Sequence, residues 1–422
     1  MRKLLFLFFV LAITVSTSIG QDKKDKDDAL LNSSVLKALK FRSVGPGFAS
    51  GRVSDIVVNP DNFSEWYVAF GSSGIWKTVN NGQTFDPIFD KYGAYAIGCL
   101  AMDPTNSNVI WAGTGENNHQ RALGYGDGVY KSVDGGKSWK NMGLKKSFHI
   151  GMIAINPENT DIVFVAAEGS AWGPGDERGL YKSIDGGKNW KKVIEISENT
   201  GINNVIIDPK NPKIMYATSE QRRRRQYGKI GGGPESAVYK SVDGGENWRK
   251  IMKGLPSGDI GGMGIAISSI NSDYVFLIVE KEGFYRSTDR GESWKKMGDH
   301  ASSGQYYNEI FCSPHDLNTI FSVETVSKIS VDGGKTWNNI GLKNRHVDDH
   351  ALWINPNDSK HFIIGGDGGI YITYDAGSNY FHVGNTASST LAFNISISKS
   401  SAIITFSSFA LQNHKYEFDG IS

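Results

Sequence analysis

Three residues spaced two apart have the side chains that a metal site or an acid–base pair needs: His346, Asp348 and His350. In an extended strand, alternate side chains lie on one face, so we expect all three to point the same way. Two imidazoles and a carboxylate suit Zn²⁺ or another divalent ion, with Glu309 and Asp367 as the nearest candidate helpers. One strand rarely supplies three converging ligands. The sequence therefore favours the alternative, a hydrogen-bond network at the centre of the protein, and no other cofactor is expected.

Three longer segments mix charge with aromatic rings: 113–128, 168–179 and 219–235. Such surfaces suit a peptide or glycan better than an apolar ligand. A protein, peptide or glycan partner is therefore expected, and solvated loops without a partner are the alternative. The predicted ligand-binding residues are Glu116, Arg121, Glu168, Trp172, Arg178, Arg223, Arg224 and Tyr306, with His119 and the rest of the run 222–225 beside them.

The elements that must position these side chains come from a repeat. The octapeptide SVDGGKSW (132–139) returns as SIDGGKNW (183–190), SVDGGENW (241–248), STDRGESW (287–294) and SVDGGKTW (330–337). Looser copies are TVNNGQTF (78–85) and TYDAGSNY (373–380), and successive copies are 43 to 58 residues apart. That period fits one four-stranded blade of a β-propeller.

Each copy, called a box turn below, is predicted to be a hairpin turn. The acidic residue accepts amide hydrogens of the turn, glycine supplies positive φ, and the final aromatic residue buries a large area. A ring of catalytic or metal-binding aspartates is the alternative, but repetition around a ring favours a structural role. The third positions are Asn80, Asp134, Asp185, Asp243, Asp289, Asp332 and Asp375.

Before each box turn lie two apolar runs joined by a polar turn that often ends in proline, as in VSDIVVNP (53–60) and WYVAF (66–70). The order in a blade is thus strand A, turn, strand B, loop, strand C, box turn, strand D. The A–B and C–D turns share one face of the ring, and the variable B–C and D–A loops share the other, where binding is expected.

We therefore predict an all-β fold, with a seven-bladed propeller over residues 39–386. FRSVG (41–45) resembles an orphan outer strand that could close an eighth blade. Strand-like runs at 391–398 and 402–409 belong to 387–422, a degenerate partial eighth repeat or a tail. A truncated form of a longer protein is a further alternative, including one without function.

Residues 1–20 have the basic start and apolar core of a secretory signal peptide cleaved near Gly20, so a secreted or periplasmic protein is expected. Residues 21–38 are expected to be a flexible lead-in.

The net charge of +1 argues against nucleic-acid binding. No other apolar run reaches the roughly 18 residues of a membrane helix. The two cysteines, Cys99 and Cys312, fall in strands A of blades two and six, so two free thiols are expected.

The box turns resemble the Asp-box, or bacterial neuraminidase repeat, of sialidases, sortilin-type receptors and tandem-propeller xyloglucanases. Over residues 41–385 the chain is similar to the N-terminal part of secreted bacterial proteins described as sortilin-like or "glycosyl hydrolase". The matching stretches are FRSVGP (41–46), GTGENN (113–118), YGDGVYK (125–131), RGLYK (178–182), HVDDHALWINP (346–356) and GGDGGIY (365–371). The resemblance specifies the fold far better than the function.

Two functions follow from this resemblance. The favoured one is a secreted binding module that is not an enzyme, and the alternative is a glycoside hydrolase of the xyloglucanase or sialidase type. A xyloglucanase-type propeller would carry a catalytic aspartate in the loop FGSSG (70–74), which has no carboxylate here. Tyr306, Tyr307 and Glu309 could imitate a sialidase Tyr/Glu pair. Hydrolysis needs two carboxylates, and the candidates are Glu116, Glu309, Asp348, Asp349 and Asp367.

Overall fold

The computed structural model describes residues 52–383 apart from 121, 226, 303–308 and 344, together with 391–398 and 401–408. These residues form an all-β structure without helices, so none of them lies in a helix that could cross a bilayer. The signal peptide, the lead-in and the strand predicted at 41–45 lie outside the described residues, as do Arg121, Tyr306 and Tyr307.

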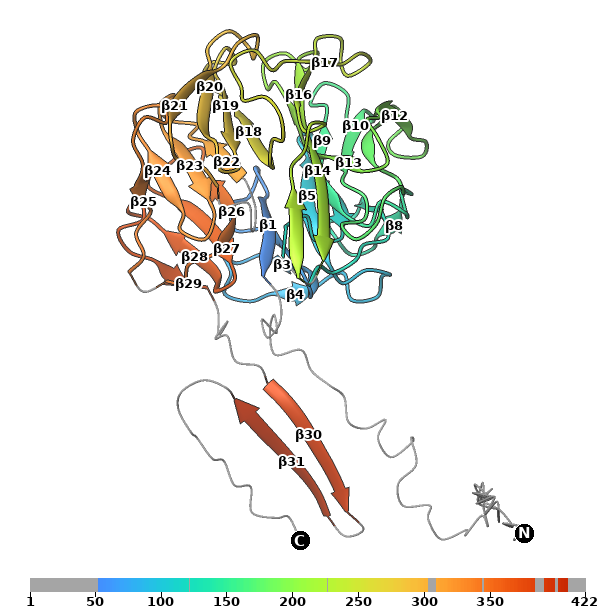
Figure 1. Cartoon of the computed structure of the whole chain (residues 1–422). Helices are drawn as coiled ribbons and strands as arrows, with labels where there is room; N and C mark the ends of the chain where they lie inside the picture. The colour runs from blue at the N-terminus through green and yellow to red at the C-terminus, as the bar shows by residue number, and fades with distance from the viewer. Residues whose placement is uncertain are drawn as a thin grey trace, which may run out of the picture. The chain divides into compact units, whose positions relative to one another are not determined.

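Seven antiparallel sheets stand in a ring, and each is one blade of a β-propeller (Figure 1). Blade 1 contains β1 (Val53–Val58), β2 (Trp66–Phe70), β3 (Gly74–Thr78) and β4 (Asp86–Pro87). Blade 2 contains β5 (Ile97–Asp103), β6 (Asn106–Thr114), β7 (Val129–Ser132) and β8 (Lys140–Asn141). Blade 3 contains β9 (Ile150–Ile155), β10 (Val163–Ala167), β11 (Gly179–Ser183) and β12 (Lys191–Ile194).

Blade 4 has a fifth strand: β13 (Thr200–Ile207), β14 (Met215–Arg225), β15 (Gly228–Gly231), β16 (Val238–Ser241) and β17 (Arg249–Lys250). Blade 5 contains β18 (Met263–Ile267), β19 (Val275–Val279), β20 (Gly283–Ser287) and β21 (Lys295–Gly298). Blade 6 contains β22 (Glu309–Cys312), β23 (Ile320–Val323), β24 (Lys328–Ser330) and β25 (Asn338–Asn339). Blade 7 contains β26 (Asp349–Ile354), β27 (Phe362–Gly366), β28 (Gly369–Thr373) and β29 (Phe381–His382).

The predicted fold class and strand order are confirmed. In every blade the chain starts at the inner strand and moves outward, so that β1 and β26 lie near the centre and β8 and β25 at the rim (Figure 1). The runs predicted at 391–398 and 402–409 form β30 (Leu391–Ser398) and β31 (Ser401–Ser408). These two strands pair with each other in a separate sheet, so the blades among the described residues number seven. Cys99 and Cys312 are free thiols on β5 and β22, as predicted.

The core lies between the blades rather than inside one sheet. The buried side chains fall into seven clusters, and each cluster combines residues of two neighbouring blades. On β6, Ile110 and Ala112 pack toward blade 1, whereas Trp111 between them packs toward blade 3. Both faces of the second strand are therefore covered, which explains why these strands are apolar without alternation.

Each box turn follows strand C of its blade and leads into strand D. In all seven, the Oδ1 atom of the third residue accepts the amide hydrogen of the residue four positions later at 2.8–3.0 Å. In blade 2, Gly135 N also donates at 2.9 Å to Asn108 O, near the start of β6 and thus beside the A–B turn, so these two turns share a face as predicted. The bonds from Ser138 lower the pKa of Asp134 to about 2.

The last residue of a box turn ties one blade to the one before it. The indole Nε1 of Trp139 donates to Ile88 O at 3.0 Å, and that of Trp190 donates to Met142 O at 2.8 Å. Trp294 repeats this contact with Ile251 O at 2.9 Å. In these blades the box turn therefore fixes both its own hairpin and the distance to its neighbour.

Replacing Asp134 with alanine should lower the free energy of unfolding by about 1–3 kcal/mol, because the turn amides lose their acceptor. Chemical denaturation of Asp134→Ala measures this, with Lys137→Ala, an exposed change in the same turn, as the control. Ligand binding below the melting temperature should be unchanged. A variant that loses binding at unchanged stability would give Asp134 a functional role instead.

Candidate functional site

The B–C and D–A end of the ring is organised by β-bulges in the first strands. Five blades carry one at the same place, where the register skips Ser54, Gly98, Gly151, Asn203 and His350. The skipped side chain reaches the next blade: Ser54 Oγ donates to Ile97 O at 2.7 Å, and Asn203 Nδ2 donates to Met263 O at 3.1 Å. At Gly98, a Cβ would lie only 2.5 Å from Ile150 O of the next blade, so the backbones themselves approach there. These bulges bring neighbouring blades into contact near the centre, from blade 7 through blade 1 to blade 5.

His350 makes the contact between blade 7 and blade 1. It is fully buried, and its Nδ1 lies 3.1 Å from Val53 O of blade 1, so Nδ1 carries the proton and donates it. Its Nε2 lies 3.5 Å from Asp367 Oδ1. Burial lowers the pKa of His350 to about 3, which keeps the imidazole neutral. The contacts of His350 are those of a hydrogen-bond network that joins blade 7 to blade 1.

The predicted ligand geometry of His346, Asp348 and His350 is wrong. Asp348 has a φ of 65°, and β26 begins only at Asp349, so strand alternation does not extend over the three residues. The Nδ1 atom of His346 bonds the carbonyl of Val347. Within the described residues, the group whose ligand atoms converge is a different one: His119, Glu220 and Glu280.

The predicted catalytic carboxylates are mostly engaged. Glu116 is buried, pairs with Arg52 Nε at 2.8 Å and accepts the amide of Gly124 at 2.7 Å. Its carboxylate fills the space that a side chain at Gly71 would need, beside the carboxylate-free loop between β2 and β3. The sequence could not show that Glu116 reaches this loop, because it enters from the next blade.

The other candidates are distributed around the centre. Asp349 is buried, pairs with Arg345 and accepts a hydrogen bond from Ser327 Oγ at 2.6 Å. Burial holds the pKa of Glu309 well above its usual range. Asp367 differs from these two, because 29% of its side chain is exposed and burial still raises its pKa.

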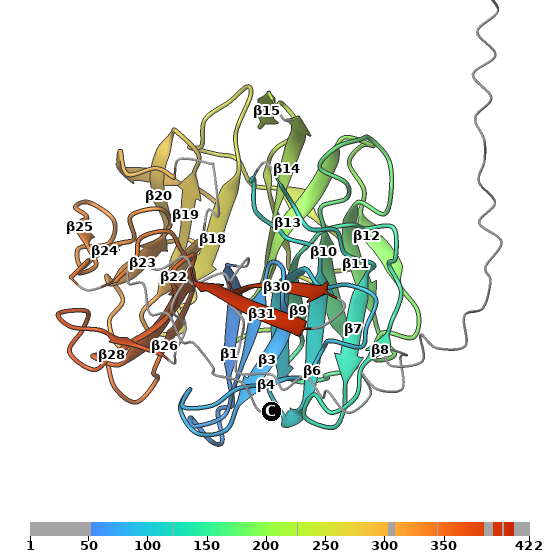
Figure 2. The ribbon, with the colours of Figure 1, turned by 90° about the horizontal axis from the view of Figure 1, so that it is seen from below.

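The segment 219–235 is not the loop predicted from the sequence. β14 continues to Arg225, and its end pairs with β15, as Figure 2 shows at the edge of the ring. Arg222 is buried, forms an ion pair with Glu168 and donates to Asn118 O at 3.0 Å. Arg224 donates to Gln120 O at 3.2 Å. The arginine run thus satisfies carbonyl groups of the blade 2 loop, which is why this segment is ordered as a hairpin.

The B–C loop of blade 3 (168–179) is also held by hydrogen bonds from an arginine to backbone carbonyl groups. Arg178 is 3% exposed and donates to the carbonyls of Glu168, Ser170, Gly173 and Gly175. It therefore does not present its guanidinium to a ligand, contrary to the prediction. Arg223 donates to Gly173 O and to Asn199 Oδ1, and Trp172 is half-buried. The arginines of the segments 168–179 and 219–235 therefore bond mainly to backbone carbonyl groups of these and neighbouring loops.

Exposed aromatic rings follow one another across blades 1 to 3 on this face. Tyr95 and Tyr125 are 61% and 50% exposed. Gly124 lies between them, since a Cβ there would be 3.6 Å from Tyr95 Cε2. The ring of Tyr125 lies 5.7 Å from that of half-buried Phe148. This aromatic row, Tyr95–Tyr125–Phe148, was missed because its members come from two D–A loops and one B–C loop, which only the ring brings together.

No known family model matches the chain. Among characterised proteins, it is similar to a xyloglucanase of Acetivibrio thermocellus, with 23% identity over 264 residues, which is 54% of this chain and 29% of that protein. A xyloglucanase of Hypocrea jecorina is 22% identical over 51% of this chain and 28% of its own length. The matched region thus spans under a third of these relatives.

Solved structures agree on the architecture. The GH74 xyloglucanase from Xanthomonas campestris superposes with a TM-score of 0.62 at 15% identity, over 86% of this chain and 59% of that one. This chain is a seven-bladed β-propeller that resembles the propeller domains of GH74 xyloglucanases. The fold is also shared with YCF48 bound to D1 peptide, at a TM-score of 0.52 and 15% identity over 78% of this chain and 95% of that one.

Replacing Arg222 with methionine should lower the free energy of unfolding by about 1–3 kcal/mol, because the carbonyl of Asn118 loses its donor and Glu168, whose pKa burial raises to about 8, loses its ion-pair partner. Arg225→Met is the matched control, since Arg225 belongs to the same run and is exposed. Urea titrations of the two variants measure the difference. Equal stability of the two would show that the run is a dispensable surface hairpin, as the sequence alone suggested.

Acid should destabilise the ring partly through His350. The unfolded chain binds a proton on this histidine below about pH 6.5, whereas the folded protein keeps it neutral down to about pH 3. The free energy of unfolding therefore decreases as the pH is lowered from about 6.5 to about 3. His350→Asn keeps a donor for Val53 O, as Asn203 does in blade 4, and removes the titration. The pH dependence of the unfolding free energy should be shallower in this variant. An unchanged slope would contradict the neutral, buried state of His350.

Proposed function

We propose that this chain is a secreted glycan-binding propeller that takes a polysaccharide of the β-glucan class along the aromatic row. The observation that carries the proposal is the row itself: Tyr95 and Tyr125 are exposed, Tyr95 lies beside Gly124, the neighbour of Tyr125, and the half-buried ring of Phe148 packs against Tyr125. The C–H faces of pyranose rings pack on aromatic rings, while their hydroxyl groups bond to a polar rim.

The surroundings of the row support a pre-organised site. Tyr125 also lies 5.9 Å from the ring of His149, which is fully buried in blade 3. Gly126 N donates to Phe148 O at 2.8 Å, and Glu116 accepts the amide of Gly124 at 2.7 Å. The backbone on both sides of Tyr125 is therefore bonded to the scaffold. A platform held in this way loses little conformational entropy when a ligand binds.

The sequence relatives support a glycan over a peptide. Both characterised relatives described above are xyloglucanases, and their matches cover about half of this chain. The peptide-bound YCF48 structure shares the fold only, at 15% identity. A β-glucan such as xyloglucan is therefore the ligand class we propose.

Glycoside hydrolysis is the second candidate, and the same relatives favour it. Asp367 is the residue we assign to it as general acid, because its carboxyl is partly exposed and burial raises its pKa, as an acid catalyst requires. Glu116 lies near enough to raise the pKa of Asp367 further and is the second carboxylate we assign. Binding is preferred, because Glu116 is buried against Arg52 and so is less free to act on a substrate.

Calorimetric titration with xyloglucan oligosaccharides tests the proposal. Tyr95→Ala and Tyr125→Ala should each weaken binding by about tenfold, which corresponds to about 1.4 kcal/mol. Tyr374→Ala is the control, because Tyr374 is 51% exposed and lies in the box turn of blade 7, on the other face. Retained binding in both row variants, or binding of peptides only, would contradict the proposal.

A reducing-end assay on the same oligosaccharides separates the two candidate functions. Binding without product formation supports the binding module. Product formation that Asp367→Asn abolishes, while binding persists, would establish the hydrolase instead.

A further inference from the structure

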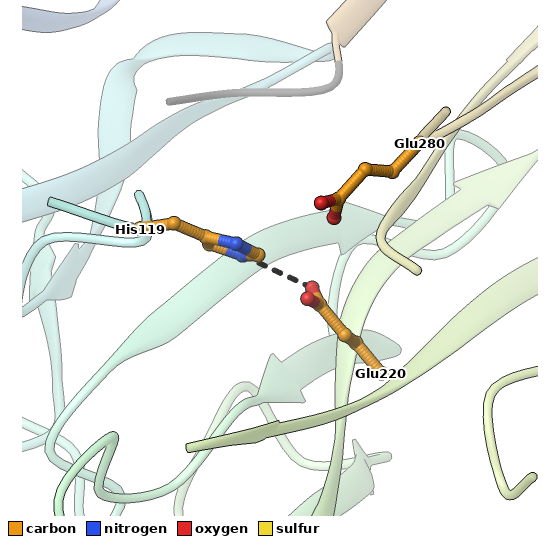
Figure 3. A group of neighbouring side chains, drawn as sticks. All are labelled: His119, Glu220 and Glu280. Carbon is orange, nitrogen blue, oxygen red and sulfur yellow. Dashed lines mark ion pairs between the residues drawn. The ribbon is translucent and has the colours of Figure 1, made fainter. Parts of the chain in front are cut away.

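We propose that His119, Glu220 and Glu280 form a binding site for one divalent transition-metal ion, with Zn²⁺ or Mn²⁺ as the ions that the donors suit. Figure 3 shows the three side chains pointing toward one another. One imidazole nitrogen and two carboxylates are donors that such ions accept, whereas Ca²⁺ prefers oxygen alone. The proposal does not rest on the glycan proposal.

Three distant parts of the chain supply the ligands. His119 comes from the loop after β6 in blade 2, Glu220 lies on β14 in blade 4, and Glu280 directly follows β19 in blade 5. Their ligand atoms all lie within 4.8 Å of one another, and His119 Nε2 is 3.1 Å from Glu220 Oε2. Ligand atoms around one ion at bond lengths of about 2.1 Å lie roughly 3–4 Å apart. The largest of these separations therefore needs to contract by about 1–2 Å.

Burial leaves one carboxylate oxygen of this group without a hydrogen-bond partner. The three residues are 6%, 4% and 2% exposed, so both carboxylates are removed from water. Glu220 Oε1 is buried and has no hydrogen-bond partner. An acceptor left in this state is costly, and an ion between the three side chains would remove the cost.

Lys229 on β15 is the competitor for this position. Its Nζ lies 3.4 Å from Glu280 Oε1 and 3.2 Å from His119 Nδ1. Donation from the ammonium to Nδ1 requires a lone pair there, which places the imidazole proton on Nε2, toward Glu220. Coordination through Nε2 requires the opposite tautomer. Metal binding and the Lys229 contact therefore exclude each other.

The remaining contacts of Glu280 hold its carboxylate in place. Oε2 accepts the amide of Gly262 at 3.2 Å, and Oε1 lies 3.2 Å from the exposed Lys281. An ion here would fasten the blade 2 loop to blades 4 and 5, in addition to the bonds that Arg222 and Arg224 already make to that loop.

The test uses the untagged protein, stripped with a chelator and titrated with ZnCl₂ or MnCl₂ in the absence of any glycan. We expect one ion per chain by calorimetry and by elemental analysis after gel filtration. Glu220→Gln and Glu280→Gln should each weaken binding at least tenfold. Glu282→Gln is the matched control, because this carboxylate is exposed two residues from Glu280.

Lys229→Met gives the sharpest outcome. Removal of the competing ammonium should tighten metal binding at least tenfold, whereas a purely structural lysine–carboxylate network predicts lower stability and no binding. The proposal is overturned if neither the wild-type protein nor Lys229→Met retains an ion, or if binding survives both glutamine variants. Should Lys229→Met fail to fold by circular dichroism, the wild-type stoichiometry and the Glu280→Gln titration decide alone.

Discussion

The ring depends on the contact between its last blade and its first. Val53 and Ile56 of blade 1 share a core with Ala351 and Ile363 of blade 7, and His350 bonds the carbonyl of Val53 across the same interface. Gly365 makes this approach feasible, since a Cβ there would lie 2.5 Å from Val53 Cγ1. Because each sheet is buried by its two neighbours, an open ring would expose an apolar face on both blade 1 and blade 7. Closure at this one interface therefore protects two faces at once.

The two ends of the ring have opposite characters for one physical reason. At the box-turn end, a short turn can satisfy its amides with its own acidic residue, so the same solution works in every blade. At the other end, longer loops carry many backbone groups with no partner of their own. Arg178, Arg222 and Arg224 supply donors to those carbonyls from neighbouring segments. The buried arginines at this end consequently stabilise the loops, and the aromatic row lies on the surface that these loops form.

Burial at this end also explains why His149 and His350 are neutral. Burial lowers the pKa of His149 and of His350 to about 3, and positive Arg222 and Arg52 reinforce the effect at each. The carboxylates nearby gain stability mostly from arginine or lysine partners. Glu220 and Asp367 face His119 and His350 instead, and Glu280 converges with the first of these two pairs.

The sequence by itself determined the seven blades, their strand order and the shared face of the box turns, because these follow from a local repeat. It also placed Cys99 and Cys312 apart, since strand A of each blade is recognisable from its own residues. Only the tertiary structure decided which side chains meet. His346, Asp348 and His350 are close in sequence, yet a positive φ at Asp348 interrupts the strand alternation that would align their side chains. His119, Glu220 and Glu280 are far apart in sequence, and so are Tyr95 and Phe148. The ring brings the residues of each set together because loops of different blades converge on one end. The repeat within a blade does not predict which residues of different blades are neighbours there.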